Sequence, residues 1–257
     1  MSNLKRLFSI QRIKKGRRLN LENNFYLHRN KLTIISGVSG TGKSTLVNIL
    51  GLIDTCDDVE IILSPSDGTQ YDYKSLYRNK TSLETVRRNY FGFMFQNDHL
   101  IDSFSILENL IFPILSRNNG NLSNYSTKGL KEKITNLMEE IGFDDLLKKG
   151  MGFFDRSPAT LSGGQRQRLS LIRGILHDPE VLIADEPIAS VDEKAASNII
   201  HVLKMLIRQG KTVILVAHNK DHHLFNECDG EFIEIVNSNQ IKFKPCITNK
   251  KGVDEVS

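Results

Sequence analysis

The stretch that decides the fold runs Gly37-Val38-Ser39-Gly40-Thr41-Gly42-Lys43-Ser44. It matches the glycine-rich pattern of a phosphate-binding loop that ends in Lys-Ser or Lys-Thr. A short apolar run at 32–35 predicts a strand before the loop, and residues 44–52 predict a helix after it. Glycines at such a junction let backbone N–H groups turn toward a phosphate at the positive end of the helix. The stretch therefore predicts a nucleotide-phosphate site in an α/β protein.

The residues of this loop have separate expected roles. Lys43 is expected to reach the β- and γ-phosphates, Ser44 to ligate magnesium and Thr45 to contact the α-phosphate. The remaining positions are expected to contact phosphate mainly through the backbone: Gly37, Val38, Ser39, Gly40, Thr41 and Gly42. The alternative is a glycine-rich turn without a ligand, and the strand and helix on either side disfavour it.

Two carboxylates follow a second apolar run, at 181–184, in the sequence Asp185-Glu186-Pro187. The carboxyl end of a buried strand is where α/β sheets place ligand chemistry. Asp185 is expected to hold magnesium, and Glu186 to polarise the attacking water as a general base. An exposed acidic turn would be the default for this pair alone, but the upstream phosphate loop favours the catalytic interpretation.

A third element, Leu161-Ser162-Gly163-Gly164-Gln165, opens a predicted helix at 164–176. Ser162 suits a helix cap, and the two glycines leave backbone N–H groups accessible. Taken alone, these residues require nothing beyond a helix start.

Five segments in this order resemble the ATP-binding-cassette (ABC) ATPase family over nearly the whole chain: the phosphate loop, Gln96, residues 161–165, residues 181–186 and His218. In that family the Leu-Ser-Gly-Gly-Gln helix of one subunit contacts the γ-phosphate held by the other. The resemblance thus implies that Ser162, Gly164 and Gln165 act in trans, within a homodimer that sandwiches ATP and Mg²⁺.

The same resemblance assigns the remaining polar residues. Gln96 resembles the Q-loop glutamine, which senses magnesium and the water while facing a membrane partner. Asp192, at the end of 189–192, resembles the D-loop aspartate at the dimer seam. His218 follows the apolar run 213–217 and resembles the switch histidine that contacts the γ-phosphate. The implied catalytic set is Glu186, His218, Lys43 and Gln96, with magnesium on Ser44, Gln96 and Asp185.

Alternating strand and helix patterns predict an α/β sheet covered on both faces. Strands are expected at 32–35, 181–184, 213–217 and 232–236, although Glu234 interrupts the last run and leaves an edge strand as the alternative. The resemblance to ABC ATPases implies a P-loop NTPase (RecA-like) core sheet with a helical ABC signature subdomain. We expect one domain over 1–257, in which 1–96 and 176–247 form the nucleotide-binding core, 97–175 the helical subdomain and 248–257 a flexible tail.

Composition narrows the class of protein. The net charge of +4 is mild for 257 residues, so no nucleic-acid partner is expected, even though positive charge is densest at 5–18. Three widely spaced cysteines form neither a disulfide framework nor a metal-ligand pattern, which indicates a reducing compartment. No stretch approaches the roughly 18 apolar residues of a membrane span. The resemblance to ABC ATPases implies a permease partner, so we expect a peripheral protein on the cytoplasmic side of the inner membrane.

Finer resemblance points toward the ATPases of lipoprotein-releasing and macrolide-export systems, on the segments 44–54, 91–96 and 107–113. The apolar residues of 91–115 are expected to fill the core, with an exposed minority forming a groove for a cytoplasmic helix of the permease. One departure concerns the adenine. The family usually places an aromatic residue near the end of its first strand, but 10–16 has none. Phe8 is the nearest candidate, and Tyr26 is expected in the core.

The expected function is that of the ATP-hydrolysing subunit of an ABC transporter. One alternative is a non-transport ABC ATPase, which would share all five segments. The other is a regulatory ATPase that drives an envelope protein without moving cargo. Only the partner separates these from transport, and the sequence names neither cargo nor direction.

Overall fold

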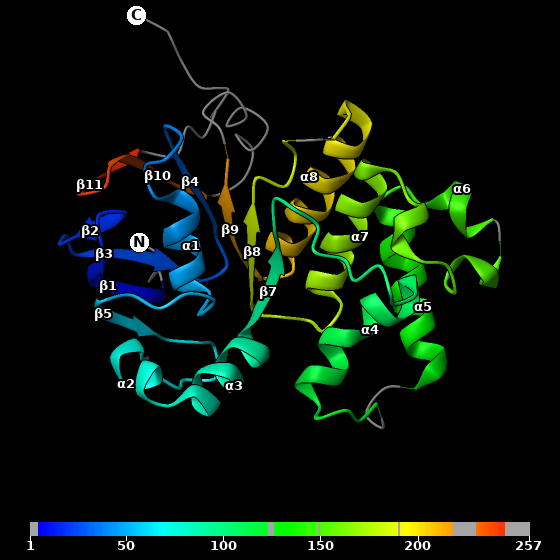
Figure 1. The fold of residues 1–257 in the computed structure, drawn as a ribbon, viewed down its shortest axis with the longest axis horizontal. Coiled ribbons are helices and arrows are strands. Elements are labelled where there is room, and N and C mark those ends of the chain that lie inside the picture. The colour runs from blue at the N-terminus through cyan, green and yellow to red at the C-terminus, as the bar shows by residue number, and fades with distance from the viewer. Residues whose placement is uncertain (1–4, 123–125, 149, 190, 218–229, 245–257) are drawn as a thin grey trace, which may run out of the picture.

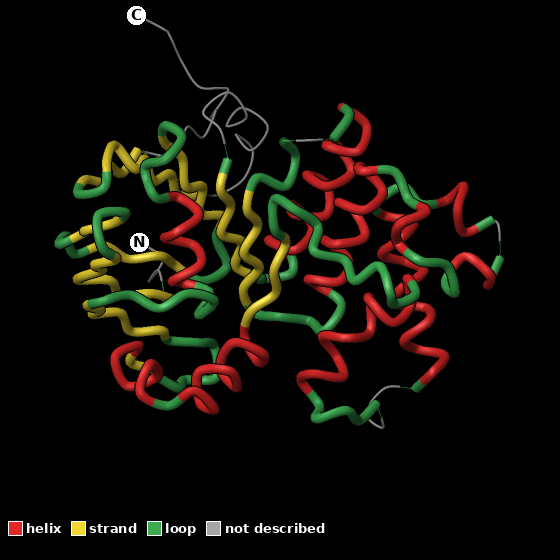
Figure 2. Tube along the Cα trace, in the orientation of Figure 1, coloured by secondary structure: helices red, strands yellow, loops and turns green. Residues whose placement is uncertain are grey.

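The computed structural model describes residues 5–122, 126–148, 150–189, 191–217 and 230–244, which form two β-sheets and eight α-helices (Figures 1 and 2). The first sheet is antiparallel and comprises β1 (Arg6–Lys15), β2 (Leu19–Leu21), β3 (Phe25–His28), β5 (Asp58–Leu63) and β6 (Tyr71–Asp72). The second comprises β4 (Leu32–Gly37), β7 (Phe91–Met94), β8 (Val181–Asp185), β9 (Thr212–Val216), β10 (Gly230–Asn237) and β11 (Gln240–Lys244).

The second sheet has the strand order β11-β10-β4-β9-β8-β7, in which all neighbours are parallel except the antiparallel pair β10–β11. Its inner strands are continuous apolar runs because both faces of the sheet are covered. The alternative of an edge position for 232–236 is wrong. β10 lies between β4 and β11, and β11 forms that edge of the sheet, with Lys242 and Lys244 in its sequence.

The helices lie on opposite faces of this sheet. They are α1 (Lys43–Leu50), α2 (Tyr73–Arg78), α3 (Lys80–Tyr90), α4 (Ile106–Arg117), α5 (Thr127–Glu140), α6 (Asp144–Leu147), α7 (Gly163–Ile175) and α8 (Glu193–Arg208). Alternate strand residues enter two separate cores: Ile183 and Ile214 pack with α1 and the antiparallel sheet, whereas Leu182 and Leu215 pack with α7 and α8. Figure 1 shows α1 on one side of the parallel strands and α7 and α8 on the other.

Glycine sets the spacing between β7 and α7. A Cβ on Gly92 would lie 2.0 Å from the carbonyl oxygen of Gly174, and one on Gly174 would lie 2.5 Å from that of Phe93. No side chain fits between these backbones, so the helix packs directly on the strand. Gln96 follows β7, and its position is therefore tied to that of α7.

Two expectations about aromatic residues are wrong. Phe8 is fully buried and packs against the rings of Tyr73 and Phe91, so it is not accessible to an adenine ring. Tyr26 is 37% exposed instead of lying in the core, because its side chain points away from the core on β3 and carries the guanidinium of Arg6 over its ring. Strand alternation places neighbouring residues on opposite faces, and the sequence alone did not fix the register of this short strand.

Candidate nucleotide-binding and catalytic site

The phosphate loop connects β4 to α1. Gly37, the last residue of β4, has φ 146°, and a Cβ there would lie 2.3 Å from the carbonyl oxygen of Ile235. Gly42 caps α1 with φ 101°. The Lys43 side chain is buried and curls over the loop, where its Nζ donates to the carbonyl oxygens of Gly37 at 3.0 Å and Val38 at 3.1 Å. An ammonium group held at the start of a helix offers strong positive potential to a phosphate.

Asp185 ends β8, two strands away from the loop in the sheet order. Burial raises the pKa of its carboxyl group, while a hydrogen bond with Ser44 acts in the opposite direction. Its Oδ1 is buried and has no hydrogen-bond partner among the residues that the structure describes. A buried carboxylate oxygen without a donor, beside a serine hydroxyl, suits a hard cation such as Mg²⁺. The residues present therefore fit the expected ion.

Glu186 follows in a backbone conformation that side chains rarely adopt, with φ 48°. Its N–H donates to the carbonyl oxygen of Val216 at 3.1 Å, which ties it to the end of β9. The side chain receives a hydrogen bond at 3.0 Å from Nε2 of Gln96, which follows β7. Residues 90 positions apart in the chain thus meet at the carboxyl edge of the sheet. Strained backbone of this kind is characteristic of functional positions.

The Leu161–Gln165 element starts α7 with a capping box. The Ser162 hydroxyl accepts from the N–H of Gln165, and Oε1 of Gln165 accepts from the N–H of Ser162. A Cβ added to Gly163 would meet no described atom within 4 Å, so this helix start is open on one side. Asp192 caps α8 close by, since its Oδ2 lies 3.9 Å from where a Cβ on Gly164 would be.

The phosphate loop and the start of α7 lie at the same edge of the sheet but on opposite faces. Gln167 donates to the carbonyl oxygen of Phe95, which places the first turns of α7 beside the carboxyl end of β7. In the order β4-β9-β8-β7, three interstrand spacings of about 4.8 Å separate β7 from the loop-bearing strand, or about 14 Å. The geometry brings Lys43, Ser44, Asp185, Glu186 and Gln96 to one place and leaves Ser162, Gly164, Gln165 and Asp192 apart.

The structure also shows what the sequence did not reveal. Gln96 was expected to act on magnesium, and its contact with Glu186 was not anticipated; no spacing in the chain indicates it. His218 lies outside the described residues, as does Ser190 of the expected D-loop.

Comparison with known proteins gives a consistent result. Residues 21–189 match the model of the family described as ABC transporter. The chain belongs to the ABC transporter family. It is 33% identical to the macrolide export ATP-binding/permease protein MacB 2 of Yersinia pestis over 76% of its own length and 26% of that protein. It is also 33% identical to a putative hemin import ATP-binding protein of Staphylococcus haemolyticus, over 80% of this chain and 83% of the other.

Among solved structures, a dimeric ATP-binding cassette in a post-hydrolysis state with ADP and Pi matches this ABC cassette with a TM-score of 0.73 and 25% identity. The match covers 92% of this chain and 98% of the other. This bears out the expected P-loop NTPase fold. The chain spans about a quarter of the length of the macrolide-export relatives that it matches. None of the helices within the described ranges is long and apolar enough to cross a bilayer.

Proposed function

We propose that this ABC cassette is the ATP-hydrolysing subunit of a transporter and energises a membrane permease through an ATP-sandwich dimer. The observation that carries the proposal is the meeting of Gln96, Glu186 and Asp185 beside the phosphate loop, at the carboxyl edge of the sheet. Each chemical role that phosphoryl transfer to water requires has a side chain there: a phosphate-binding cation, a magnesium ligand and a base.

In the proposed mechanism, Lys43 releases the carbonyl oxygens of its own loop to bind the β- and γ-phosphates. Ser44 and Asp185 would hold Mg²⁺, which when bound neutralises charge on the phosphate oxygens. Glu186 accepts a proton from the attacking water, and Gln96 orients the Glu186 carboxylate by donating to it. In the proposal, His218 also contacts the γ-phosphate.

A second chain completes the site in this proposal. The start of α7 lies on the opposite face of the sheet from the phosphate loop of its own chain, which supports the proposal that Ser162, Gly164 and Gln165 serve the γ-phosphate of the partner subunit. A two-fold dimer forms two equivalent sites in this way. Asp192, next to Gly164, would lie at the seam.

The base assignment is tested by Glu186→Gln, which keeps the shape of the side chain and removes its charge. We expect the variant to bind ATP with wild-type affinity, to lose turnover by at least about a hundredfold, and to accumulate as an ATP-bound dimer. Size exclusion with ATP and Mg²⁺, together with phosphate release, measures these outcomes. Normal hydrolysis by the variant would exclude Glu186 as the base.

The dimer is tested with the wild-type protein. If that protein stays monomeric and its hydrolysis rate per molecule does not change on dilution, the proposed dimer is contradicted.

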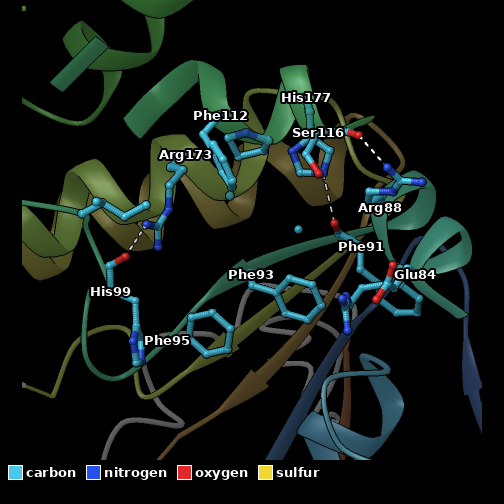
Figure 3. Close-up of a pocket in the computed structure, with 15 residues that line it drawn as sticks. Glu84, Arg88, Phe91, Phe93, Phe95, His99, Phe112, Ser116, Arg173 and His177 are labelled. Carbon is cyan, nitrogen blue, oxygen red and sulfur yellow. Dashed lines mark hydrogen bonds between the residues drawn. The ribbon is translucent and has the colours of Figure 1, made fainter. Parts of the chain in front are cut away.

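A groove beside the Q-loop is the proposed docking site for the permease, on the cytoplasmic side of the membrane. It has a volume of about 490 Å³ and lies between α3, β7, α4 and α7 (Figure 3). Phe93 and Phe95 of the sheet side face Phe112 of α4 across it, and Phe112 is 49% exposed. Arg88 and Arg173 add positive charge to the walls. An amphipathic helix with apolar and acidic residues suits such a surface.

The docking site is tested by Phe112→Asp, with Phe243→Asp as a matched control because Phe243 is similarly exposed, at 53%, on β11. We expect the first variant to lose the membrane protein that co-purifies with the wild type, and the second to retain it. Equal recovery with both variants would exclude the groove. Identifying the co-purified protein also separates a transporter from a non-transport or regulatory ATPase. The names of the relatives differ between export and import, so we propose no cargo or direction.

A further inference from the structure

An arginine on α7 binds the segment that follows Gln96. Arg166 donates from Nε and Nη2 to both carboxylate oxygens of Asp98, each at 2.9 Å, and from Nη1 to Asp102 at 2.7 Å. A fork-to-fork pair of this kind fixes orientation as well as distance. Asp98 is only two residues from Gln96, whereas Arg166 directly follows Gln165 at the start of α7.

A second arginine of the same helix strengthens this connection. Arg173 lies seven residues, or two turns, beyond Arg166 and therefore on the same helix face. Its guanidinium donates to the carbonyl oxygen of His99 at 2.7 Å (Figure 3). It also donates to the carbonyl oxygen of Asp98, again at 2.7 Å. The Q-loop segment 98–102 is thus held to α7 by two side chains, as well as by the close contact of Gly174 with Phe93.

The Arg166–Asp98 ion pair is largely shielded from solvent. The two side chains are only 19% and 22% exposed, so the pair is screened less than a surface ion pair. Burial alone would raise the pKa of Asp98, but hydrogen bonds from Arg166 and from the N–H of Leu100 hold it below its ordinary value. Asp98 therefore stays ionised and paired at neutral pH.

We propose that Arg166 is a positioning residue for hydrolysis: through Asp98 it sets Gln96 against Glu186. The inference rests on the proposed function, because Glu186 is the base there. It adds a physical link between two sites of the dimer. The start of α7 serves the nucleotide on the partner subunit, and the same helix, through Arg166, holds the glutamine that contacts the base of its own chain. A shift of α7 on the partner's nucleotide moves Gln96 with it.

Kinetics of Arg166→Ala test the proposal. We expect kcat to fall on the order of tenfold or more, with KM for ATP within about twofold, because misplacement affects the chemical step and not nucleotide binding. Arg166→Lys supplies a point charge without the fork and should recover part of the rate. Adding Asp98→Ala to Arg166→Ala should cost no more than either change alone. Arg12→Ala, which also removes an arginine paired with two carboxylates (Asp58 and Glu60), is the control and should leave kcat unchanged.

A second measurement does not depend on hydrolysis. The chain has no tryptophan, so Phe95→Trp places a single reporter next to Gln96. We expect acrylamide quenching of that tryptophan to rise at least about twofold on adding Arg166→Ala, since the segment loses its anchor, and not on adding Arg12→Ala. The inference is overturned if Arg166→Ala leaves the quenching unchanged. It is also overturned if Arg166→Ala and Arg12→Ala lower kcat equally and lower the thermal midpoint equally. If the wild-type protein does not hydrolyse ATP, the proposed function is refuted. The quenching measurement then decides by itself whether Arg166 anchors the segment that carries Gln96.

Discussion

At the residue scale, the buried carboxylate of Asp185 lowers the stability of the folded protein when it is ionised. Burial is the largest influence on this group, and the neighbouring Glu186 adds to it; both raise the pKa. Ser44 and Lys43 offset only part of the effect. A group whose pKa is raised by folding prefers its proton in the folded state. Its ionisation therefore opposes folding at neutral pH.

Replacing this carboxylate should stabilise the protein without nucleotide. We expect Asp185→Asn to have a higher thermal midpoint at pH 7 than the wild type, and to lose magnesium-dependent ATP hydrolysis. The wild type should lose stability relative to the variant as pH rises from about 3.8, the ordinary value, through the raised pKa of Asp185. The gap in midpoint should close below that window. Differential scanning calorimetry over pH 3–8 measures it.

Asp155→Asn is the control, because it removes a carboxylate that is exposed. Its thermal midpoint at pH 7 should equal that of the wild type. Asp185→Asn could instead prove less stable than the wild type at pH 7. The ionised carboxylate would then have its hydrogen-bond partners in the folded protein, and its assignment as a magnesium ligand would lose its physical basis.

At the element scale, α7 has more roles than its sequence indicates. Ser162 as a cap and the glycines of the motif predict a helix from residue 164, and the structure begins α7 at Gly163 with a capping box at Ser162 and Gln165. Local pattern sufficed there because a cap depends on residues three apart. The contacts of Arg166 with Asp98 and of Gly174 with Phe93 join residues far apart in sequence, and their distances depend on tertiary packing. The same limit explains Phe8: its burial depends on Tyr73 and Phe91 of other elements.

The contact of α7 with β7 predicts a strong effect from one methyl group. In Gly174→Ala the new Cβ would lie 2.5 Å from the backbone oxygen of Phe93, so helix and strand must separate. We expect a loss of about 1–3 kcal/mol in unfolding free energy, measured by chemical denaturation. Gly163→Ala, in the same helix with no described atom within 4 Å, should lose none. Equal denaturation midpoints for the two variants would show that the backbone spacing is not tight.

At the scale of the whole molecule, each chain carries two half-sites: the phosphate loop before α1 and the start of α7. The position of each half-site depends on which face of the sheet its helix covers. The sequence predicted the phosphate loop and the carboxylates of β8 because strand ends and helix starts are local patterns. Strand order, which sets the separation between α1 and α7, arises from pairing across the chain and was not predicted. The result is that one chain presents a phosphate loop on one face of the sheet and the start of α7 on the other.

This arrangement predicts that two inactive variants restore each other. Lys43→Ala removes the phosphate cation from one half-site, and Ser162→Arg blocks the other, so each pure dimer should be inactive. A mixed dimer isolated by two affinity tags pairs the intact loop of one chain with the intact α7 start of the other. It therefore contains one whole site and should reach up to about half of the wild-type rate, since a two-fold dimer has two equivalent sites. Thermal melts first establish that Ser162→Arg folds, because loss of the cap costs about 1 kcal/mol. If instead each chain hydrolyses ATP with its own residues alone, mixing leaves the rate at that of the parent variants, and the shared site is excluded.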